Sequence, residues 1–321
     1  MKHFWKACLA IGMAGLAVTS AQAQAAYPSR VVRIIVPAPA GTGPDVMARL
    51  YAEHLGRSLG QSFVVEDRPG ASGNLGADAV AHAPADGYTL LYAYNQIPTM
   101  NPHLFSKLSY DPVKDLVPIS QTLSTAYVLL GNNDLPAKDL AGIIDYARKN
   151  PGKLAYASYG PGTASHLVME LIQDSEKVQF LHVPYKQGQV TDVIGGQVAM
   201  VIEPFPSAIP MVKSGKVRAL AVTTDKRIKE LPDAPTMSEA IKGLTLYGWQ
   251  GVWAPAGTPP DILAKLQSEF ARITKLPDMQ KRIADFASVP IGSTGPEMAS
   301  AIQRESQQWG AVIRDKRITL D

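Results

Sequence analysis

Short runs of strand-forming residues alternate with helical segments along most of this chain. Residues 31–37 (VVRIIVP) are rich in β-branched side chains and end at a glycine- and proline-rich loop, residues 38–44. A helical pattern follows from Asp45 to Gly60, and the segments SFVVED and NLGADAVAHA then repeat the strand and the helix. This order of elements is typical of an α/β domain with a parallel sheet.

The same alternation starts again in the second part of the chain. Residues 139–151 and 161–175 have helical patterns, whereas KLAYASY, QFLHVPY and VRALAVTT have the pattern of strands. A chain of 321 residues is long enough for two domains, and its last part is long enough to return to the first domain. We therefore predict two hinged α/β lobes, with residues 26–124 plus 236–321 in lobe 1 and residues 125–235 in lobe 2.

The first 25 residues have the pattern of a secretory signal peptide. Two lysines precede an apolar run at residues 8–18, and the sequence AQAQA follows, which predicts cleavage after Ala23 or Ala25. Cys8 is the only cysteine, so the mature chain has no thiol for a disulfide, a thiolate metal site or a cysteine nucleophile. We expect a soluble protein of the periplasm.

The charge composition argues against nucleic acid or a membrane surface as a partner. The chain has 31 Lys and Arg against 28 Asp and Glu, and cleavage would remove Lys2 and Lys6 and leave 29 basic residues. Proteins that bind nucleic acid electrostatically carry a basic excess or a basic patch. A nearly neutral mature chain lacks that signature, and no nucleic-acid partner is expected.

The loop between the first strand and the first helix could bind an anion. Gly41 and Gly43 precede the helix, but Val46 stands where a dinucleotide-binding loop has its third glycine, and two prolines remove amide donors. We therefore disfavour a nucleotide. A glycine loop before a helix N-terminus still offers free N–H groups and a positive dipole end to a carboxylate. A tight turn capped by Asp45 is about equally consistent with the local sequence.

A second loop of this kind occurs in the predicted second lobe. SYGPGTASH, residues 158–166, again joins a strand, a glycine loop, hydroxyl residues and a helix start. Thr163 and Ser165 could donate to a ligand oxygen or could cap the helix. His166 follows directly, and a lone histidine in such a place is more often structural than catalytic. Two helix N-termini, one from each lobe, would then face each other across a cleft.

Catalytic chemistry finds little support in the sequence. Neither Ser158 nor Ser165 lies in the G-x-S-x-G frame of an α/β hydrolase. Ser165 and His166 are neighbours on a helix, so their side chains point about 100° apart and cannot easily form a nucleophile–base pair. Metal-binding motifs are also absent from the sequence. We expect no catalytic residue, no metal and no cofactor.

Aromatic side chains at predicted strand ends could form the wall of a ligand pocket. They are Tyr94, Tyr159, Tyr185 and Phe205, and each could instead belong to the core of its lobe. Asp192 could bind a ligand amine or cap its own helix, and we favour the cap.

Several sequence blocks occur in the order found in one known family. VPAPAGTGPDVMARL is followed by VVEDRPGASGNLGADAVAHAPADGYTLL, SYGPGTASHLVMELI, HVPYKQGQVTDVIGGQVAM and WQGVWAPAGTPP. Through this series the chain resembles the Bug family, the extracytoplasmic substrate-binding proteins of tripartite tricarboxylate transporters. The resemblance implies a two-lobed Venus-flytrap fold, similar to type II periplasmic binding proteins. Such a fold closes on a small carboxylate in the cleft between the lobes.

The resemblance also implies which residues form the site. The first loop of that family binds a carboxylate through backbone amides and ordered waters, which carries over to residues 39–45. The second loop contributes hydroxyls and amides, which carries over to Thr163, Ser165 and His166. The chain departs from the family pattern at Ala38, where an aromatic residue is usual, and at Thr42 and Gln187, where glycines are usual.

The expected function is that of a periplasmic receptor for a small carboxylate. We expect a dicarboxylate, with an aromatic acid also open, delivered by a monomeric receptor to the membrane permease subunits of a tripartite tricarboxylate transporter. A secreted α/β hydrolase and a ligand sensor for a signalling partner are the alternatives. The expected ligand-binding residues are Pro39, Ala40, Gly41, Thr42, Gly43, Pro44, Asp45, Tyr94, Asn95, Ser158, Tyr159, Thr163, Ala164, Ser165, His166, Asp192 and Phe205.

Overall fold

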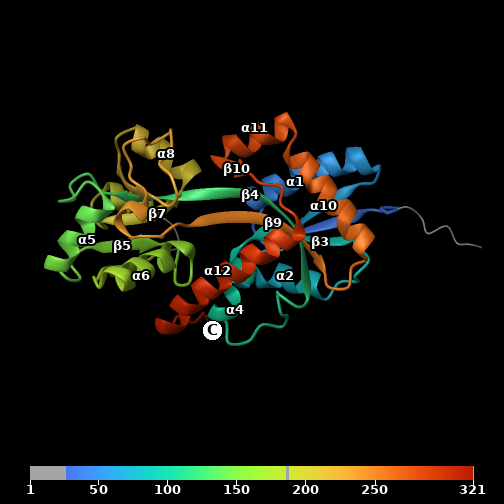
Figure 1. Ribbon diagram of the computed structural model, residues 1–321, viewed down its shortest axis with the longest axis horizontal. Coiled ribbons are helices and arrows are strands. Elements are labelled where there is room, and N and C mark those ends of the chain that lie inside the picture. The colour runs from blue at the N-terminus through green and yellow to red at the C-terminus, as the bar shows by residue number, and fades with distance from the viewer. Residues whose placement is uncertain (1–26, 186–187, 321) are drawn as a thin grey trace, which may run out of the picture.

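The protein has two α/β lobes joined by long strands (Figure 1). The structure, a computed structural model, describes residues 27–185 and 188–320, so the predicted signal peptide and Gln187 lie outside the described residues. The strands are hydrogen-bonded in the order β2-β1-β3-β9-β4-β7-β5-β6, and β8 and β10 also pair with β4. The two-lobed α/β fold predicted from the sequence is confirmed.

Lobe 1 contains the first strands of the chain in the predicted order. β1 (Val32–Val36) pairs in parallel with β2 (Phe63–Asp67) and with β3 (Thr89–Tyr94). Its helices are α1 (Gly43–Leu59), α2 (Asn74–Ala81), α3 (Gln96–Thr99), α4 (Asn101–Leu104), α10 (Pro260–Thr274) and α11 (Pro277–Asp285), with a 3-10 turn, η1, at Ala71–Gly73. The apolar side chains of β1 and β3 are fully buried between these helices, as a strand covered on both faces requires.

Lobe 2 repeats this arrangement with shorter strands. β5 (Ala155–Ser158) pairs in parallel with β6 (Leu181–Pro184) and with β7 (Met200–Pro204). The remaining elements are α5 (Leu140–Lys149), α6 (Ala164–Glu176), α7 (Gln189–Ile194), α8 (Phe205–Lys213), β8 (Arg218–Val222) and α9 (Met237–Ala240).

Two strands connect the lobes. β4 (Leu116–Gly131) pairs antiparallel with β9 (Tyr247–Pro255) in lobe 1 and then with β7 and β8 in lobe 2, while β10 (Ser288–Pro290) pairs with its middle part. The βα alternation predicted parallel strands throughout, and the antiparallel pairs arise because β4 takes the chain into lobe 2 and β9 brings it back. β4 runs without a break through the boundary predicted at residues 124 and 125.

The last helix also spans both lobes. α12 (Gly295–Asp315) starts at a capping box formed by Thr294 and Glu297. Near its start Met298 belongs to a core of lobe 1, whereas Trp309 and Ile313 near its end belong to the main core of lobe 2. Figure 1 shows this helix running diagonally from one lobe toward the other. The side chains of α12 therefore tie the two lobes together.

Candidate ligand-binding cavity

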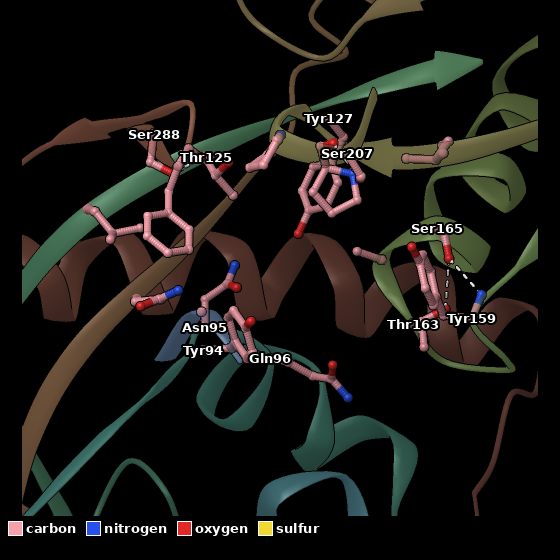
Figure 2. A pocket seen from close by; sticks show the side chains of 18 of the residues that line it. Tyr94, Asn95, Gln96, Thr125, Tyr127, Tyr159, Thr163, Ser165, Ser207 and Ser288 are labelled. Atoms are coloured by element: carbon pink, nitrogen blue, oxygen red, sulfur yellow. Dashed lines mark hydrogen bonds between the residues drawn. The ribbon is translucent and has the colours of Figure 1, made fainter. Parts of the chain in front are cut away.

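A cavity of about 520 Å³ lies between the lobes, a size typical of sites for small organic ligands. Figure 2 shows its side chains projecting from both lobes into one space. The residues that line it are Gly43, Met47, Tyr94, Asn95, Gln96, Met100, Leu123, Thr125, Tyr127, Tyr159, Thr163, Ala164, Ser165, Ile202, Pro204, Pro206, Ser207, Gln250, Phe286 and Ser288. The predicted residues among them are Gly43, Tyr94, Asn95, Tyr159, Thr163, Ala164 and Ser165, so the fold brings residues from both predicted loops together.

The first predicted loop contributes less to this cavity than the sequence indicated. Only Gly43 lines it, whereas Pro39, Ala40, Gly41, Thr42, Pro44 and Asp45 do not. The helix starts at Gly43, so its N-cap position is Thr42, three residues before the predicted cap Asp45. The N–H groups of Gly43 and Asp45 belong to the first turn, where they have no intrahelical acceptor. The helix N-terminus is therefore the part of this loop that remains open to an anion.

The rest of the first loop is held by its own side chains. The Asp45 carboxylate accepts a hydrogen bond from the Gly41 amide at 2.7 Å, and Thr42 Oγ1 donates to the Pro39 carbonyl at 2.7 Å. Arg49 lies between Asp45 and Asp67, 2.6 Å from one carboxylate and 3.0 Å from the other. Partial burial and the nearby negative charge of Asp45 raise the pKa of Asp67. The Gly41 amide, expected to bind a ligand, is thus already used within the loop.

The second predicted loop is folded around its hydroxyl groups. Thr163 is the N-cap residue of α6, but its hydroxyl donates to the Gly160 carbonyl at 2.7 Å and makes no capping bond. Ser165 Oγ accepts from the Tyr159 amide at 3.1 Å and lies 3.0 Å from Thr163 Oγ1, contacts that Figure 2 shows as dashed lines. These bonds hold the loop so that Tyr159, Thr163 and Ser165 face the cavity. The cap predicted for either hydroxyl is absent from the described structure of this loop.

Ser158 and His166 do not line the cavity, but they accept hydrogen bonds from backbone amides of the second loop. The fully buried Ser158 hydroxyl accepts from the Gly160 amide at 3.0 Å and lies 2.6 Å from His182 Nε2. His166 Nδ1 accepts from the Gly162 amide at 3.1 Å, and its ring stacks on His182 with centroids 4.2 Å apart. Burial, and then the neighbouring His182, lower the pKa of His166 to about 4. His166 is therefore neutral at physiological pH and acts as an acceptor for the loop.

A buried carboxylate lies behind the lobe 2 wall. Glu203, at 1% exposure, accepts from Tyr159 Oη at 2.7 Å and from Ser207 Oγ at 2.9 Å, and Gln189 Nε2 lies 3.5 Å away. Burial raises the pKa of Glu203, while these donors oppose that shift. Phe205, a predicted site residue, packs instead into the core of lobe 2, and its neighbours Pro204, Pro206 and Ser207 line the cavity.

A second acid lies behind the lobe 1 wall. Glu305 of α12 accepts from Asn95 Nδ2 at 2.9 Å and from Trp249 Nε1 at 2.7 Å. Burial raises its pKa as well, and the bonds from Asn95 and Trp249 oppose the shift. Gln250, the next residue on β9, lines the cavity beside Gly43, since a Cβ atom placed on Gly43 would lie 3.3 Å from Gln250 Nε2.

Asp192 lies away from the cavity lining and does not cap its helix. The N-cap residue of α7 is Gly188, and Asp192 Oδ2 accepts a hydrogen bond from Tyr185 Oη at 2.7 Å. The predicted cap fails because the N-cap position is Gly188, four residues before Asp192. Tyr185, which the sequence indicated as a possible pocket wall, does not line the cavity either.

Sequence reasoning missed Gln250, Ser207 and the two glutamates. Two of them have a weak local signal, because Glu203 interrupts the apolar run AMVIEP and Gln250 interrupts the aromatic strand YGWQGVW. A polar residue inside an apolar strand must find a partner when it is buried. The signal does not say where that partner lies. In the structure, β9 places Gln250 at the cavity and β7 places Glu203 behind the lining residues Tyr159 and Ser207.

The described part of the chain offers no metal centre and no membrane span. Residues 27–185 and 188–320 contain no group of three or more His, Cys, Asp or Glu side chains that could hold a metal ion. In the same ranges every helix is too short or too polar to cross a membrane.

Comparison with known proteins identifies the family of this chain. The model of the tripartite tricarboxylate transporter family receptor matches residues 47–318. This chain belongs to that receptor family. Protein BugT of Bordetella pertussis is 35% identical over 293 residues, which cover 90% of each chain. The resemblance seen in the sequence blocks is confirmed.

Solved structures of similar sequence have the same fold. The Rhodopseudomonas palustris protein Rpa4515, solved with adipate, has a TM-score of 0.78 and 33% identity, over 92% of this chain and 100% of that one. MatC of the same organism, with bound malate, has a TM-score of 0.74 and 31% identity, over 89% and 100%. A third similar structure, the periplasmic binding protein BugD, has a TM-score of 0.74 and 31% identity, over 92% of this chain and 100% of that one. Because the matched family is a receptor family, the present family member is a receptor and not an enzyme. The buried Ser158–His182 contact is accordingly structural.

Proposed function

We propose that this receptor captures a small carboxylate in the periplasm and delivers it to the permease subunits of a tripartite tricarboxylate transporter. The observation that carries the proposal is the cavity between the lobes, where the N-termini of α1 and α6 both lie at the lining. Free N–H groups and the positive end of the helix dipole stabilise an anion, by about 0.3–1 kcal/mol at an exposed site and up to about 2 when partly buried.

In this proposal, closure of the lobes links ligand binding to recognition of the receptor by the permease. The two crossing strands β4 and β9 form the hinge. The lobes keep the bounds expected from the sequence except just after residue 235, because Met237, Ile241 and Leu246 pack in the core of lobe 2. A ligand that contacts both walls favours the closed form, so binding shifts the population toward the form that the permease recognises. The receptor acts as a monomer after its signal peptide is removed.

Malate and adipate, found in two structural neighbours, support the choice of a small carboxylate for this chain. The aromatic rings of Tyr94, Tyr127 and Tyr159 give the cavity a partly apolar wall that suits the carbon skeleton of such an acid, aliphatic or aromatic. Sensing for a signalling partner would use the same site, and uptake assays in cells with and without the receptor separate that role from transport.

The proposal is tested by thermal unfolding of residues 26–321 with a panel of mono- and dicarboxylates. A ligand at 100 times its Kd adds about 2.7 kcal/mol to the free energy of unfolding, which raises the melting temperature measurably. Mass spectrometry of the ligand afterwards should recover it unchanged. If no carboxylate raises the melting temperature, the proposed function is wrong.

A further inference from the structure

The cavity has acidic groups behind both walls and no basic side chain on them. Glu203 contacts the lining residues Tyr159 and Ser207 in lobe 2, and Glu305 contacts the lining residue Asn95 in lobe 1. Among the described residues that line the cavity there is no Lys, Arg or His. The charged side chains that contact the lining residues described here, Glu203 and Glu305, are therefore acidic, although the site belongs to a family of carboxylate receptors.

The hydrogen bonds of the two glutamates fit their ionised form. Glu305 accepts on both carboxylate oxygens, from the indole N–H of Trp249 and the amide N–H of Asn95, which are groups that can only donate. Glu203 likewise accepts from Tyr159 and Ser207. A protonated Glu305 would have no acceptor for its own hydrogen at either partner, and the hydroxyls of Tyr159 and Ser207 donate to Glu203 when it is ionised.

Glu203 orients the hydroxyl groups of Tyr159 and Ser207 in the lobe 2 wall. Tyr159 donates its hydroxyl hydrogen to Glu203, and Ser207 lies 2.9 Å from both Glu203 Oε2 and the Pro204 carbonyl, either of which can take its single hydrogen. In both cases the hydroxyl oxygens are left to the cavity as acceptors. On the lobe 1 wall, Gln250 is 7% exposed and its Oε1 atom has no hydrogen-bond partner. A buried acceptor without a partner is costly unless a ligand supplies a donor.

The helix N-termini provide the opposite polarity in the same space. The amides of Ala164 and Ser165 lie in the first turn of α6, and that of Gly43 lies in the first turn of α1, so they have no intrahelical acceptors. These donors suit a carboxylate. The cavity thus has places for one anionic group and, in front of Glu203, a place for a group that donates hydrogen bonds and carries positive charge.

We propose that the preferred ligand of this receptor is a carboxylate that also carries a protonated amino group, with the ammonium held at the Tyr159–Ser207 wall in front of Glu203. The inference rests on the proposed function and refines its ligand class. A second carboxylate at that wall would face Glu203 across two acceptor oxygens, so a dianion is disfavoured. An ammonium group supplies up to three donors and the matching charge.

Matched six-carbon acids test this inference on the unmodified protein. Calorimetric titration compares hexanoate, adipate, 2-aminohexanoate and 6-aminohexanoate with residues 26–321, and a four-carbon pair adds malate and aspartate. We expect at least one amino acid to bind ten-fold or more tightly than the matched acid that lacks the amine. Tighter binding of adipate or malate than of every amino acid overturns the inference and leaves the proposed function intact. Binding of none of these acids overturns both.

The variant Glu203→Gln tests the role assigned to the acid. It removes the charge and keeps the side-chain shape, so it should lower the affinity for the amino acid ten-fold or more. Affinity for the matched acid without the amine should stay or rise. Equal loss for both ligands would mean that Glu203 only supports the wall, and would overturn its assigned role.

Two further variants keep this test interpretable. Ser207→Ala removes one of the two acceptor oxygens and leaves Glu203 in place, so it should also reduce the preference for the amino acid; an unchanged preference counts against the inference. Glu53→Gln makes the same chemical change as Glu203→Gln at an exposed position of α1 that does not line the cavity, and should leave both affinities unchanged.

Discussion

The Gly41 amide donates a hydrogen bond to the Asp45 carboxylate, 2.7 Å away, across the start of α1. Asp45 is 3% exposed and also lies against Arg49, so one buried acid fixes both the loop and the first turn of the helix. A loop held in this way keeps the N–H groups of the helix N-terminus at the cavity before any ligand arrives. Pre-organisation of this kind lowers the cost of binding.

The variant Asp45→Ala should therefore be destabilised. Loss of this buried acceptor leaves the Gly41 amide without its partner and the Arg49 guanidinium with Asp67 alone, which should lower the free energy of unfolding by about 1–3 kcal/mol. Urea denaturation measures this change. Glu53→Ala, on the exposed face of the same helix, is the control and should change the stability by less than about 0.5 kcal/mol. Equal effects of the two substitutions would contradict the role given to Asp45.

Ser165 should affect both the stability of the second loop and ligand binding. Ser165→Ala removes the acceptor of the Tyr159 amide, a bond worth about 1 kcal/mol, and with it a hydroxyl at the cavity. We expect a small loss of stability and at least a five-fold loss of ligand affinity, measured by calorimetry. Ser175→Ala on the exposed side of α6 is the matched control. An unchanged affinity in Ser165→Ala would show that this hydroxyl serves the loop alone.

His166 should make the protein less stable as the pH falls. Its pKa is lowered to about 4 in the folded protein, against 6.5 as the ordinary value, so between pH 6.5 and about 4 the unfolded chain binds the proton and the folded chain does not. Stability is therefore fully present above pH 6.5 and is lost through this window, with a slope of up to about 1.4 kcal/mol per pH unit for one such proton. The pKa of His182 is lowered by burial too and adds in the same direction.

The variant His166→Gln tests this pH dependence. Its side-chain oxygen can still accept from the Gly162 amide, but it cannot take up a proton in this range. Urea denaturation at several pH values between 4 and 7 should give a flatter dependence of stability on pH for the variant than for the wild type. Parallel curves would mean that His166 is not the group responsible.

Local sequence patterns located both loops at the cavity but not the bonds within them. The glycines and hydroxyls near Gly43 and Ser165 indicate a strand–loop–helix turn, and the fold places both turns at the cavity. Whether a given backbone amide is free to bind a ligand depends on nearby side chains such as Asp45. Tertiary packing determines whether Asp45 caps the helix or accepts a hydrogen bond from the Gly41 amide. Phe205 fails as a wall residue for the same reason, because its helix turns it into the core.

The acids behind the walls could not be located from sequence at all. Glu203 comes from β7 and Glu305 from α12, and their partners Tyr159 and Trp249 lie more than 40 residues away along the chain. Pairings of this range depend on the whole topology, including the antiparallel crossing strands β4 and β9. The family resemblance predicts the overall fold, whereas the polarity of the cavity depends on these long-range pairings.

The most direct test of the account is to narrow the cavity at Gly43. Its backbone does not need glycine, and a Cβ atom there would lie 3.3 Å from Gln250 Nε2 and 3.5 Å from Tyr94 Oη, so a larger side chain would enter the binding space. Calorimetric titration of the best carboxylate should show one site on the wild type, at least a ten-fold weaker site on Gly43→Val, and unchanged binding by Gly56→Val in the same helix. Unchanged affinity in Gly43→Val would contradict the account, since the ligand would then bind outside this cavity.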